Sequence, residues 1–171
     1  NKKNNSNEYR WLHKNFGTNY RLTEFQSAIG RKQLSKLDHW IKLRTRNANI
    51  LNDALMYVDC IRVPKFESNI KNAWYKYYVY LKEENLRSDW SRTRIIKELN
   101  DINFPAFSGS CSEIYLEECF KKAGLNPRQR LKNAKLLGET SLMFLVHHTI
   151  TEAQMHSYAE QIKKVCNLAS K

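Results

Sequence analysis

The clearest strand pattern in the sequence is Ala73-Trp74-Tyr75-Lys76-Tyr77-Tyr78-Val79-Tyr80-Leu81. Aromatic and β-branched side chains fit the pleated surface of a sheet, and here they occupy both of its alternating faces. A strand with apolar side chains on both faces is typical of the middle of a sheet. We therefore expect residues 73–81 to form a central strand.

Shorter patterns on either side of this strand complete the fold class. The other predicted strands are 61–63, 102–107 and 142–146. Residues 88–91 offer caps for a helix whose apolar residues are Ile95, Ile96 and Leu99, and the other predicted helices of this region are 112–123, 131–140 and 151–169. This order predicts an α+β domain, in which a small, mostly antiparallel sheet has helices packed on one side and a long N-terminal helix in front.

Two capping boxes mark helix starts, at Thr23-Glu24-Phe25-Gln26 and at Thr151-Glu152-Ala153-Gln154. In such a box the Thr oxygen accepts from the third helical amide, and the Gln side chain reaches back to the cap. Apolar residues follow the first box at helical spacing as far as Leu55. The sequence therefore predicts three parts: a loop or dimer-contact segment at 1–22, a linking helix at 23–56, and a small α+β domain at 57–171.

The charge of the chain is strongly positive, with 29 Lys and Arg against 17 Asp and Glu and a formal net charge of +12. The first fifty residues hold eleven of these basic residues and three acidic ones. A basic surface attracts polyanions such as nucleic acid, anionic membranes or phosphorylated small molecules. Charge alone does not choose among these partners.

No membrane or export signal is evident in the sequence. The longest apolar run, residues 142–146, is far shorter than the roughly 20 residues that span a bilayer. The start has no apolar core of a signal peptide and no initiator Met, so we expect a processed or excised piece of a cytoplasmic protein. The four cysteines form no CxxC pair, which favours reduced thiols and argues against a zinc site.

Common catalytic motifs are missing from the sequence. It contains no GxSxG elbow, no P-loop and no GxGxxG turn, and Cys111 has the setting of an ordinary loop cysteine. His147 and His148 follow the last predicted strand. Adjacent side chains of an extended segment point in opposite directions, so this pair is a poor metal site. One of the two could line a cleft, or simply bond to a backbone carbonyl.

One block of the sequence resembles a known family. Residues Phe16-Gly17-Thr18-Asn19-Tyr20-Arg21-Leu22-Thr23-Glu24-Phe25-Gln26-Ser27-Ala28-Ile29-Gly30 resemble the G-x-N-[YWF]-R-[ML]-T-x-x-Q-A-A-I-G block of the DegT/StrS family. Members of that family are nucleotide-sugar aminotransferases that depend on pyridoxal phosphate (PLP). Later stretches agree in order, at 109–115, 137–142 and 146–151. The resemblance thus covers nearly the whole chain.

The resemblance implies the C-terminal part of a fold-type I aminotransferase. In the family, a lysine that forms a Schiff base with PLP lies upstream of the Asn-Tyr-Arg block, in a Gly-rich segment that these 171 residues do not contain. The full enzyme would move an amino group from glutamate to a nucleotide-linked keto sugar, for surface polysaccharide, as a homodimer. The isolated chain would be inactive and would bind no cofactor tightly.

The resemblance also implies roles for five residues. Asn19 matches the family residue that reaches the PLP phosphate of the neighbouring subunit. Arg21 matches an arginine two positions further on, at the entrance to the same cofactor site. His147 matches the histidine that lines the sugar pocket, although His148 replaces the usual Pro. Glu113 and Tyr115 match the loop that faces the substrate. Amide and guanidinium groups are good phosphate donors, which agrees with the first two roles.

A second hypothesis rests on the charge alone. A stand-alone basic module that binds nucleic acid or another polyanion would explain the net charge of +12. The tyrosines around Lys76 superficially resemble a base-stacking strand, but the glycines of an RNP motif are missing there. Nucleic acid is therefore the less favoured partner.

Overall fold

The computed structural model describes residues 20–171 and divides the chain into two compact units, 1–36 and 37–171. In the first unit, α1 (Glu24–Leu34) begins at the predicted capping box. The Thr23 hydroxyl oxygen accepts from the Gln26 amide, and the Gln26 side chain accepts from the Thr23 amide at 3.0 Å. The first predicted helix start is thus confirmed. No residue of α1 is buried within this unit.

The helical region 23–56 consists of two helices, whereas the sequence pattern predicted one. α1 ends at Leu34, and α2 (Leu37–Leu55) begins three residues later. The Ser35 hydroxyl donates to the Lys32 carbonyl at 2.9 Å, and the Lys36 amide donates to the Gln33 carbonyl in a tight turn. A serine that bonds to the backbone in this way competes with helix continuation. The spacing of apolar residues carries no information about this competition, so it predicted one continuous helix.

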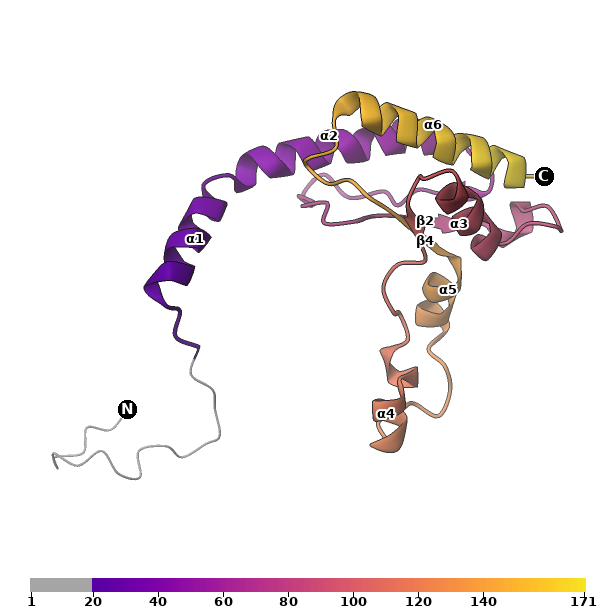
Figure 1. Cartoon of the computed structure of the whole chain (residues 1–171). Helices are drawn as coiled ribbons and strands as arrows, with labels where there is room; N and C mark the ends of the chain where they lie inside the picture. Colours follow the sequence, from indigo (N-terminus) through magenta and orange to yellow (C-terminus); the bar gives the residue numbers. More distant parts are fainter. Residues whose placement is uncertain (1–19) are drawn as a thin grey trace, which may run out of the picture. The chain divides into compact units, whose positions relative to one another are not determined.

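A four-stranded antiparallel sheet forms the centre of the second unit (Figure 1). Its strands are β1 (Ile61–Arg62), β2 (Tyr77–Leu81), β3 (Ala106–Phe107) and β4 (Ser141–Phe144), in the order β1-β2-β4-β3. In the register, Tyr77 pairs with Phe144 and Ala106 pairs with the same residue from the other side. The central position predicted for the 73–81 strand is therefore confirmed.

The central strand starts later than the sequence pattern predicted, at Tyr77 instead of Ala73. Trp74 adopts a left-handed backbone conformation with φ of 50°, which a strand does not contain. Its amide donates to the Asn72 side-chain oxygen at 2.8 Å, so residues 72–74 form a turn.

Helices α2, α3 (Arg92–Asp101) and α6 (Glu152–Ala169) share one buried apolar cluster with the sheet. Figure 1 shows α2 and α6 side by side and running in the same direction. Fully buried members of the cluster include Leu51, Leu55, Tyr77, Val79, Ile95, Leu99, Phe144, Met155 and Ile162. The α+β fold class, with a small antiparallel sheet, is confirmed. The second capping box is also confirmed, because Thr151 and Gln154 bond reciprocally at the start of α6.

Residues 108–140, which we call the arm, connect β3 to β4 and extend away from the sheet (Figure 1). The arm contains η2 (Ile114–Leu116), α4 (Glu118–Lys122) and α5 (Lys132–Thr140). The helix predicted at 112–123 is thus two short pieces, because Glu117 between them has an extended backbone. A further short turn, η1 (Glu83–Asn85), follows β2. Among residues 20–171, no helix has the length and apolarity needed to cross a membrane.

Candidate functional site

The five residues predicted from the family resemblance fall into three places. Asn19 lies outside the described residues. Arg21 is exposed in the extended segment before α1. Glu113 and Tyr115 lie in the arm, which leaves the sheet where β3 ends and β4 begins. His147 follows the other end of β4, so the structure does not bring His147 together with Glu113 and Tyr115.

In the arm, Glu113 is the centre of a hydrogen-bonded cluster. Its side chain is largely buried, and it accepts from Arg130 through both carboxylate oxygens, with Nε at 2.8 Å from Oε1. The Tyr115 hydroxyl donates to the same Oε1 at 2.6 Å and accepts from the Leu131 amide at 2.9 Å. Arg130 also pairs with Glu139 at 3.1 Å. The cluster therefore joins η2 to the segment that leads into α5.

Hydrogen bonds from Arg130 and Tyr115 lower the pKa of Glu113 from its ordinary value of 4.5 to about 2. The pKa of Tyr115 is raised, first by burial and then by its bond to Glu113. At neutral pH Glu113 is thus an ionised carboxylate whose oxygens are already bonded within the arm. Such a group is suited to holding the loop in shape and not to giving up a proton.

A cavity of about 520 Å³ lies beside this cluster, between the arm and the start of α3. Serine hydroxyls from residues 108–112 line it together with Arg92, Glu117 and Glu139. Hydroxyls and charges of both signs are the groups that bind polar, hydroxyl-rich ligands. Of the predicted site residues, Glu113 lines this cavity and His147 does not.

At the opposite end of β4, His147 is exposed and anchored to Thr149. Its Nδ1 is 2.8 Å from the Thr149 hydroxyl and accepts from the Thr149 amide at 3.4 Å. With Nδ1 as the acceptor of this backbone N–H, the contact favours the neutral tautomer that carries its proton on Nε2. His147 thus presents an N–H donor that suits a hydroxyl or a phosphate oxygen.

The ring of His148 lies next to that of His147 and stacks on Trp40 of α2. The centroids of the two histidine rings are 4.3 Å apart, and those of Trp40 and His148 are 4.6 Å apart. The prediction that the two histidines point in opposite directions is therefore wrong. The strand ends at Phe144, so these residues lie in a turn where the alternation of a strand does not apply.

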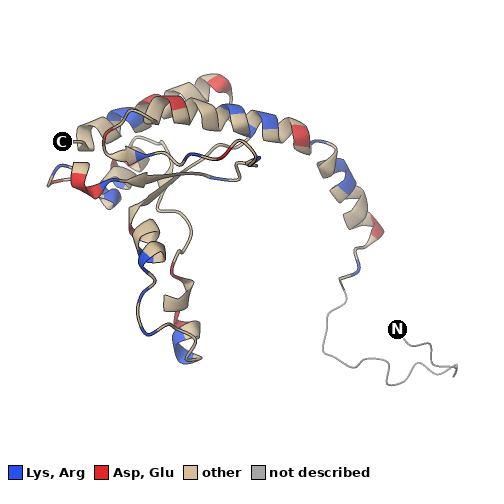
Figure 2. Ribbon diagram, turned by 180° about the vertical axis from the view of Figure 1, so that it is seen from behind, with Lys and Arg blue, Asp and Glu red and all other residues tan. Residues whose placement is uncertain are grey.

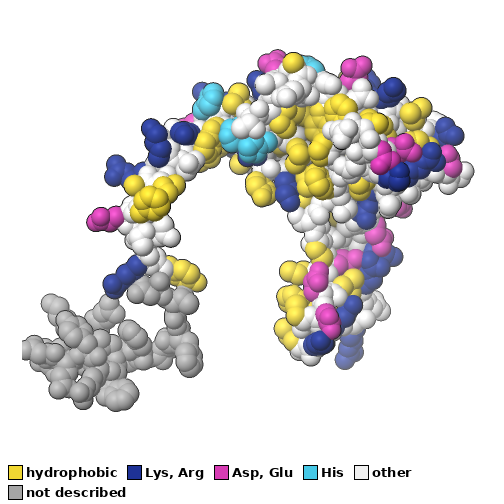
Figure 3. All heavy atoms as spheres, in the orientation of Figure 1, with side chains coloured by type: hydrophobic (Ala, Val, Ile, Leu, Met, Phe, Trp, Pro, Cys, Tyr) yellow, Lys and Arg dark blue, Asp and Glu magenta, His cyan; other side chains and the backbone are white. Residues whose placement is uncertain are grey.

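The surroundings of His148 disfavour its charged form. Burial lowers its pKa most, and the nearby His147, Arg44 and His39 lower it further. Arg44 also donates from Nη1 to the carbonyls of Trp74 and Tyr75, at 3.0 and 3.2 Å. We call Trp40, Arg44, Trp74, His147 and His148 the histidine end of the sheet, and Figure 3 shows histidine side chains gathered at this surface. Sequence reasoning missed Trp40 and Trp74 here, because only the fold brings three distant segments together.

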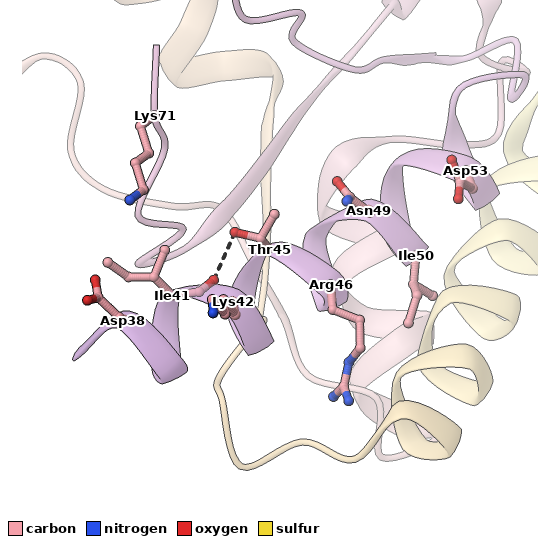
Figure 4. A pocket seen from close by; sticks show the side chains of 9 residues that line it. All are labelled: Asp38, Ile41, Lys42, Thr45, Arg46, Asn49, Ile50, Asp53 and Lys71. Carbon is pink, nitrogen blue, oxygen red and sulfur yellow. Dashed lines mark hydrogen bonds between the residues drawn. The ribbon is translucent and has the colours of Figure 1, made fainter. Parts of the chain in front are cut away.

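A larger groove, of about 750 Å³, lies along α2, with Lys71 of the segment before β2 in its lining (Figure 4). It is lined by Asp38, Ile41, Lys42, Thr45, Arg46, Asn49, Ile50, Asp53 and Lys71. The lining mixes both charges and includes none of the predicted site residues. Size alone therefore does not make this groove the functional site.

Basic residues are interspersed with acidic ones in the second unit. Figure 2 shows both signs of charge on α2 and α6: the basic residues of α2 lie between Asp38 and Asp53, and those of α6 follow Glu152 and Glu160. Several of these charges are paired, as Arg46 is with Glu152 and Lys122 with Glu118. Among residues 37–171 the basic residues therefore do not form the uninterrupted stripe typical of nucleic-acid surfaces.

A lysine that holds PLP as a Schiff base needs a particular environment. Such a lysine lies in a pocket that removes it from water. Among residues 20–171, every lysine is exposed except Lys76 and Lys82, which are half-buried. Lys76 lies over the ring of Tyr75 at 5.6 Å. None of these lysines has the buried setting that attachment of PLP demands.

The chain is similar to proteins of one family over most of its length. The model of the DegT/DnrJ/EryC1/StrS aminotransferase family matches residues 2–163. A solved aminotransferase from Psychrobacter cryohalolentis is 46% identical, with a TM-score of 0.83 over 95% of this chain and 43% of its own.

Curated relatives are more distant. The erythromycin biosynthesis sensory transduction protein EryC1 of Saccharopolyspora erythraea is 27% identical over 92% of this chain and 41% of its own length. The 3-amino-5-hydroxybenzoate synthase of Amycolatopsis mediterranei is 25% identical over 90% of this chain and 40% of its own length. The chain thus spans about two fifths of the curated relatives that it matches.

Proposed function

Because the chain belongs to the DegT/DnrJ/EryC1/StrS aminotransferase family, we propose that it is the C-terminal portion of a PLP-dependent enzyme that aminates a nucleotide-linked keto sugar. The observation that carries this proposal is the 46% identity to a solved aminotransferase that shares the fold over 95% of the chain. The amino donor would be glutamate. The product would serve amino-sugar synthesis for surface polysaccharide, in a cytoplasmic homodimer.

In this proposal the five predicted site residues bind the cofactor or the substrate, or support the loop that faces the substrate. Asn19 and Arg21 would contact the PLP phosphate bound in the neighbouring subunit, and Arg21 is exposed and so available for this contact. His147 would donate from Nε2 to the sugar nucleotide. Glu113 and Tyr115, which bond to each other, would hold the arm in shape where it faces the substrate.

When bound, PLP supplies the electron sink that makes amino transfer possible. No lysine among residues 20–171 is buried, so the lysine that holds PLP would come from outside these residues. The described residues would instead bind and orient the ligands. We therefore propose that the isolated chain does not catalyse amino transfer.

The test uses the 171-residue chain beside the full-length protein. Each is mixed with PLP and dialysed, retained cofactor is measured by absorbance, and amino transfer from glutamate to a keto-sugar nucleotide is assayed. We expect retention and turnover by the full-length protein and neither by the short chain. Turnover by the short chain would disprove its inactivity, and failure of the full-length protein on every sugar nucleotide would disprove the substrate class.

A salt titration with DNA addresses the basic-module hypothesis. Affinity that is sub-micromolar and falls steeply with salt is typical of a protein that neutralises many phosphates. We expect the 171-residue chain to bind DNA only weakly, because the charges along α2 and α6 are mixed. Tight, salt-sensitive binding would favour the module over the aminotransferase.

A further inference from the structure

Asn47 is a buried polar residue of α2 whose amide bonds to the backbone of the histidine end. Its side chain is 0% exposed, in a helix whose neighbouring residues Ala48 and Leu51 belong to the apolar core. Asn47 Nδ2 donates to the His147 carbonyl at 2.9 Å. An amide in an apolar setting costs free energy unless it is hydrogen-bonded, so this bond stabilises one particular position of the His147 peptide.

The other end of the Asn47 amide is bonded as well. Its Oδ1 accepts from Arg46 Nε at 3.1 Å and from Nη2 at 2.9 Å. Arg46 Nη2 also donates to the Ile150 carbonyl at 3.1 Å, and Nη1 pairs with Glu152 at the start of α6. Figure 4 shows Arg46 reaching from α2 toward the loop that precedes α6. The two adjacent residues of α2 therefore hold that loop at both His147 and Ile150.

From these contacts we propose that Asn47 is a positioning residue, which acts through the His147 backbone to set where the imidazole lies. Two anchors fix that residue: Asn47 holds its carbonyl, and Thr149 holds Nδ1 of its ring. With both anchors in place, the proton of the neutral imidazole stays on Nε2. The proposal rests on the proposed function only where it takes His147 to contact substrate.

Substitution by Asp separates the two bonds of Asn47. In the variant Asn47→Asp the carboxylate can still accept from Arg46, but it has no N–H to donate to the His147 carbonyl. Without that bond the loop loses one anchor, and the Thr149 contact no longer fixes a single ring state. We therefore expect the proton of the His147 ring to distribute over both nitrogens.

The matched control is Asn52→Asp in the same helix. Asn52 also bonds through its side chain, because its Oδ1 accepts from the Tyr77 hydroxyl at 2.7 Å. It does not bond to residues 147–150. This variant therefore tests whether any disturbed asparagine of α2 would change the histidine.

The experiment records long-range ¹H–¹⁵N spectra of the histidine rings in the 171-residue chain across pH. The wild-type protein should show the neutral His147 ring with its proton on Nε2. In the variant Asn47→Asp, the signals of both ring nitrogens should move toward those of a mixture of the two neutral tautomers. In Asn52→Asp these signals should be unchanged. Unchanged His147 signals in folded Asn47→Asp would overturn the proposal, as would an equal shift in the control.

If Asn47→Asp does not fold, Asn47→Ser replaces it, because a neutral, shorter side chain also loses the reach to His147. In full-length enzyme we expect the loop shift to lower kcat/KM for the sugar nucleotide by about tenfold or more, since small misplacements of a binding group are costly. A changed spectrum with unchanged kcat/KM would leave the positioning intact and disprove the role of His147 at the substrate.

Discussion

Gly109 lies so close to Tyr78 that a Cβ atom on Gly109 would stand 2.5 Å from Cε1 of the tyrosine ring. The Ser110 amide donates to the Tyr78 hydroxyl at 3.1 Å immediately afterwards in the chain. Gly109 also has a φ of 95°, which favours glycine. The arm is therefore seated directly on the strand β2 at its first turn.

The variant Gly109→Ala should lower the free energy of unfolding by more than Gly124→Ala. Both glycines have a positive φ, but a Cβ at Gly124 meets nothing within 4 Å. Gly124→Ala should cost about 1–3 kcal/mol from backbone strain alone. Gly109→Ala should cost about 1–3 kcal/mol more, because the extra atom displaces Tyr78. Urea denaturation measures both, and equal losses would show that the contact is irrelevant.

Glu113 should make the stability of the chain depend on pH. Its folded pKa, about 2, lies below the ordinary 4.5, so folding favours the ionised form. The stabilisation is complete above about pH 4.5 and is lost as the pH falls toward 2. The difference in unfolding free energy between wild type and Glu113→Gln should therefore be constant near neutral pH and shrink in that window.

The control for this pH dependence is Glu118→Gln. Glu118 pairs with Lys122 on the same arm, but both side chains are more than 70% exposed. Exposed pairs contribute little, so this variant should follow wild type closely at every pH. Parallel curves for wild type and Glu113→Gln from pH 7 to 2 would contradict the prediction.

Replacing Arg44 should loosen the turn before β2. Arg44 donates to the carbonyls of Trp74 and Tyr75, and Arg44→Met leaves both without this donor. We expect a loss of about 1–3 kcal/mol and faster amide exchange at 74–77. Lys42→Met, an exposed change in the same helix, should stay within about 0.5 kcal/mol of wild type. Unchanged exchange in Arg44→Met would rule out the role of the arginine.

Replacing either of two phenylalanines in neighbouring strands by alanine should lower the free energy of unfolding, but by very different amounts. Phe144 is fully buried and faces the Tyr158 ring edge-on, with centroids 6.1 Å apart. Phe107 is 43% exposed. Phe144→Ala should cost about 3–5 kcal/mol, and Phe107→Ala should cost clearly less. Thermal or urea unfolding gives both values, and a reversed order would contradict the assigned core.

Local patterns predicted the order of the elements. The two Thr-x-x-Gln boxes gave correct helix starts because a capping box involves only residues three apart. The aromatic stretch around Tyr77 gave the central strand because its neighbours on both faces are apolar. These features depend on interactions between residues that are close in the sequence, so they can be predicted from it.

Contacts between distant segments could not be predicted in the same way. Arg130 binds Glu113 across seventeen residues, and Asn47 binds the His147 carbonyl across one hundred. No rule of sequence spacing predicts either of these contacts. The left-handed Trp74 is a similar case, since Arg44 and Asn72 hold a conformation that tryptophan rarely adopts alone.

The order β1-β2-β4-β3 also bears on how the protein is made. β4 emerges from the ribosome after β2 and β3 but lies between them, and it pairs with both. Until residue 144 has been synthesised, β2 and β3 each have an unpaired edge, because the strand that pairs with that edge, β4, is incomplete. Open edges of nascent chains are sites of aggregation. Slow translation or a stop before Ser141 would thus leave the sheet in two unjoined pieces, β1-β2 and β3.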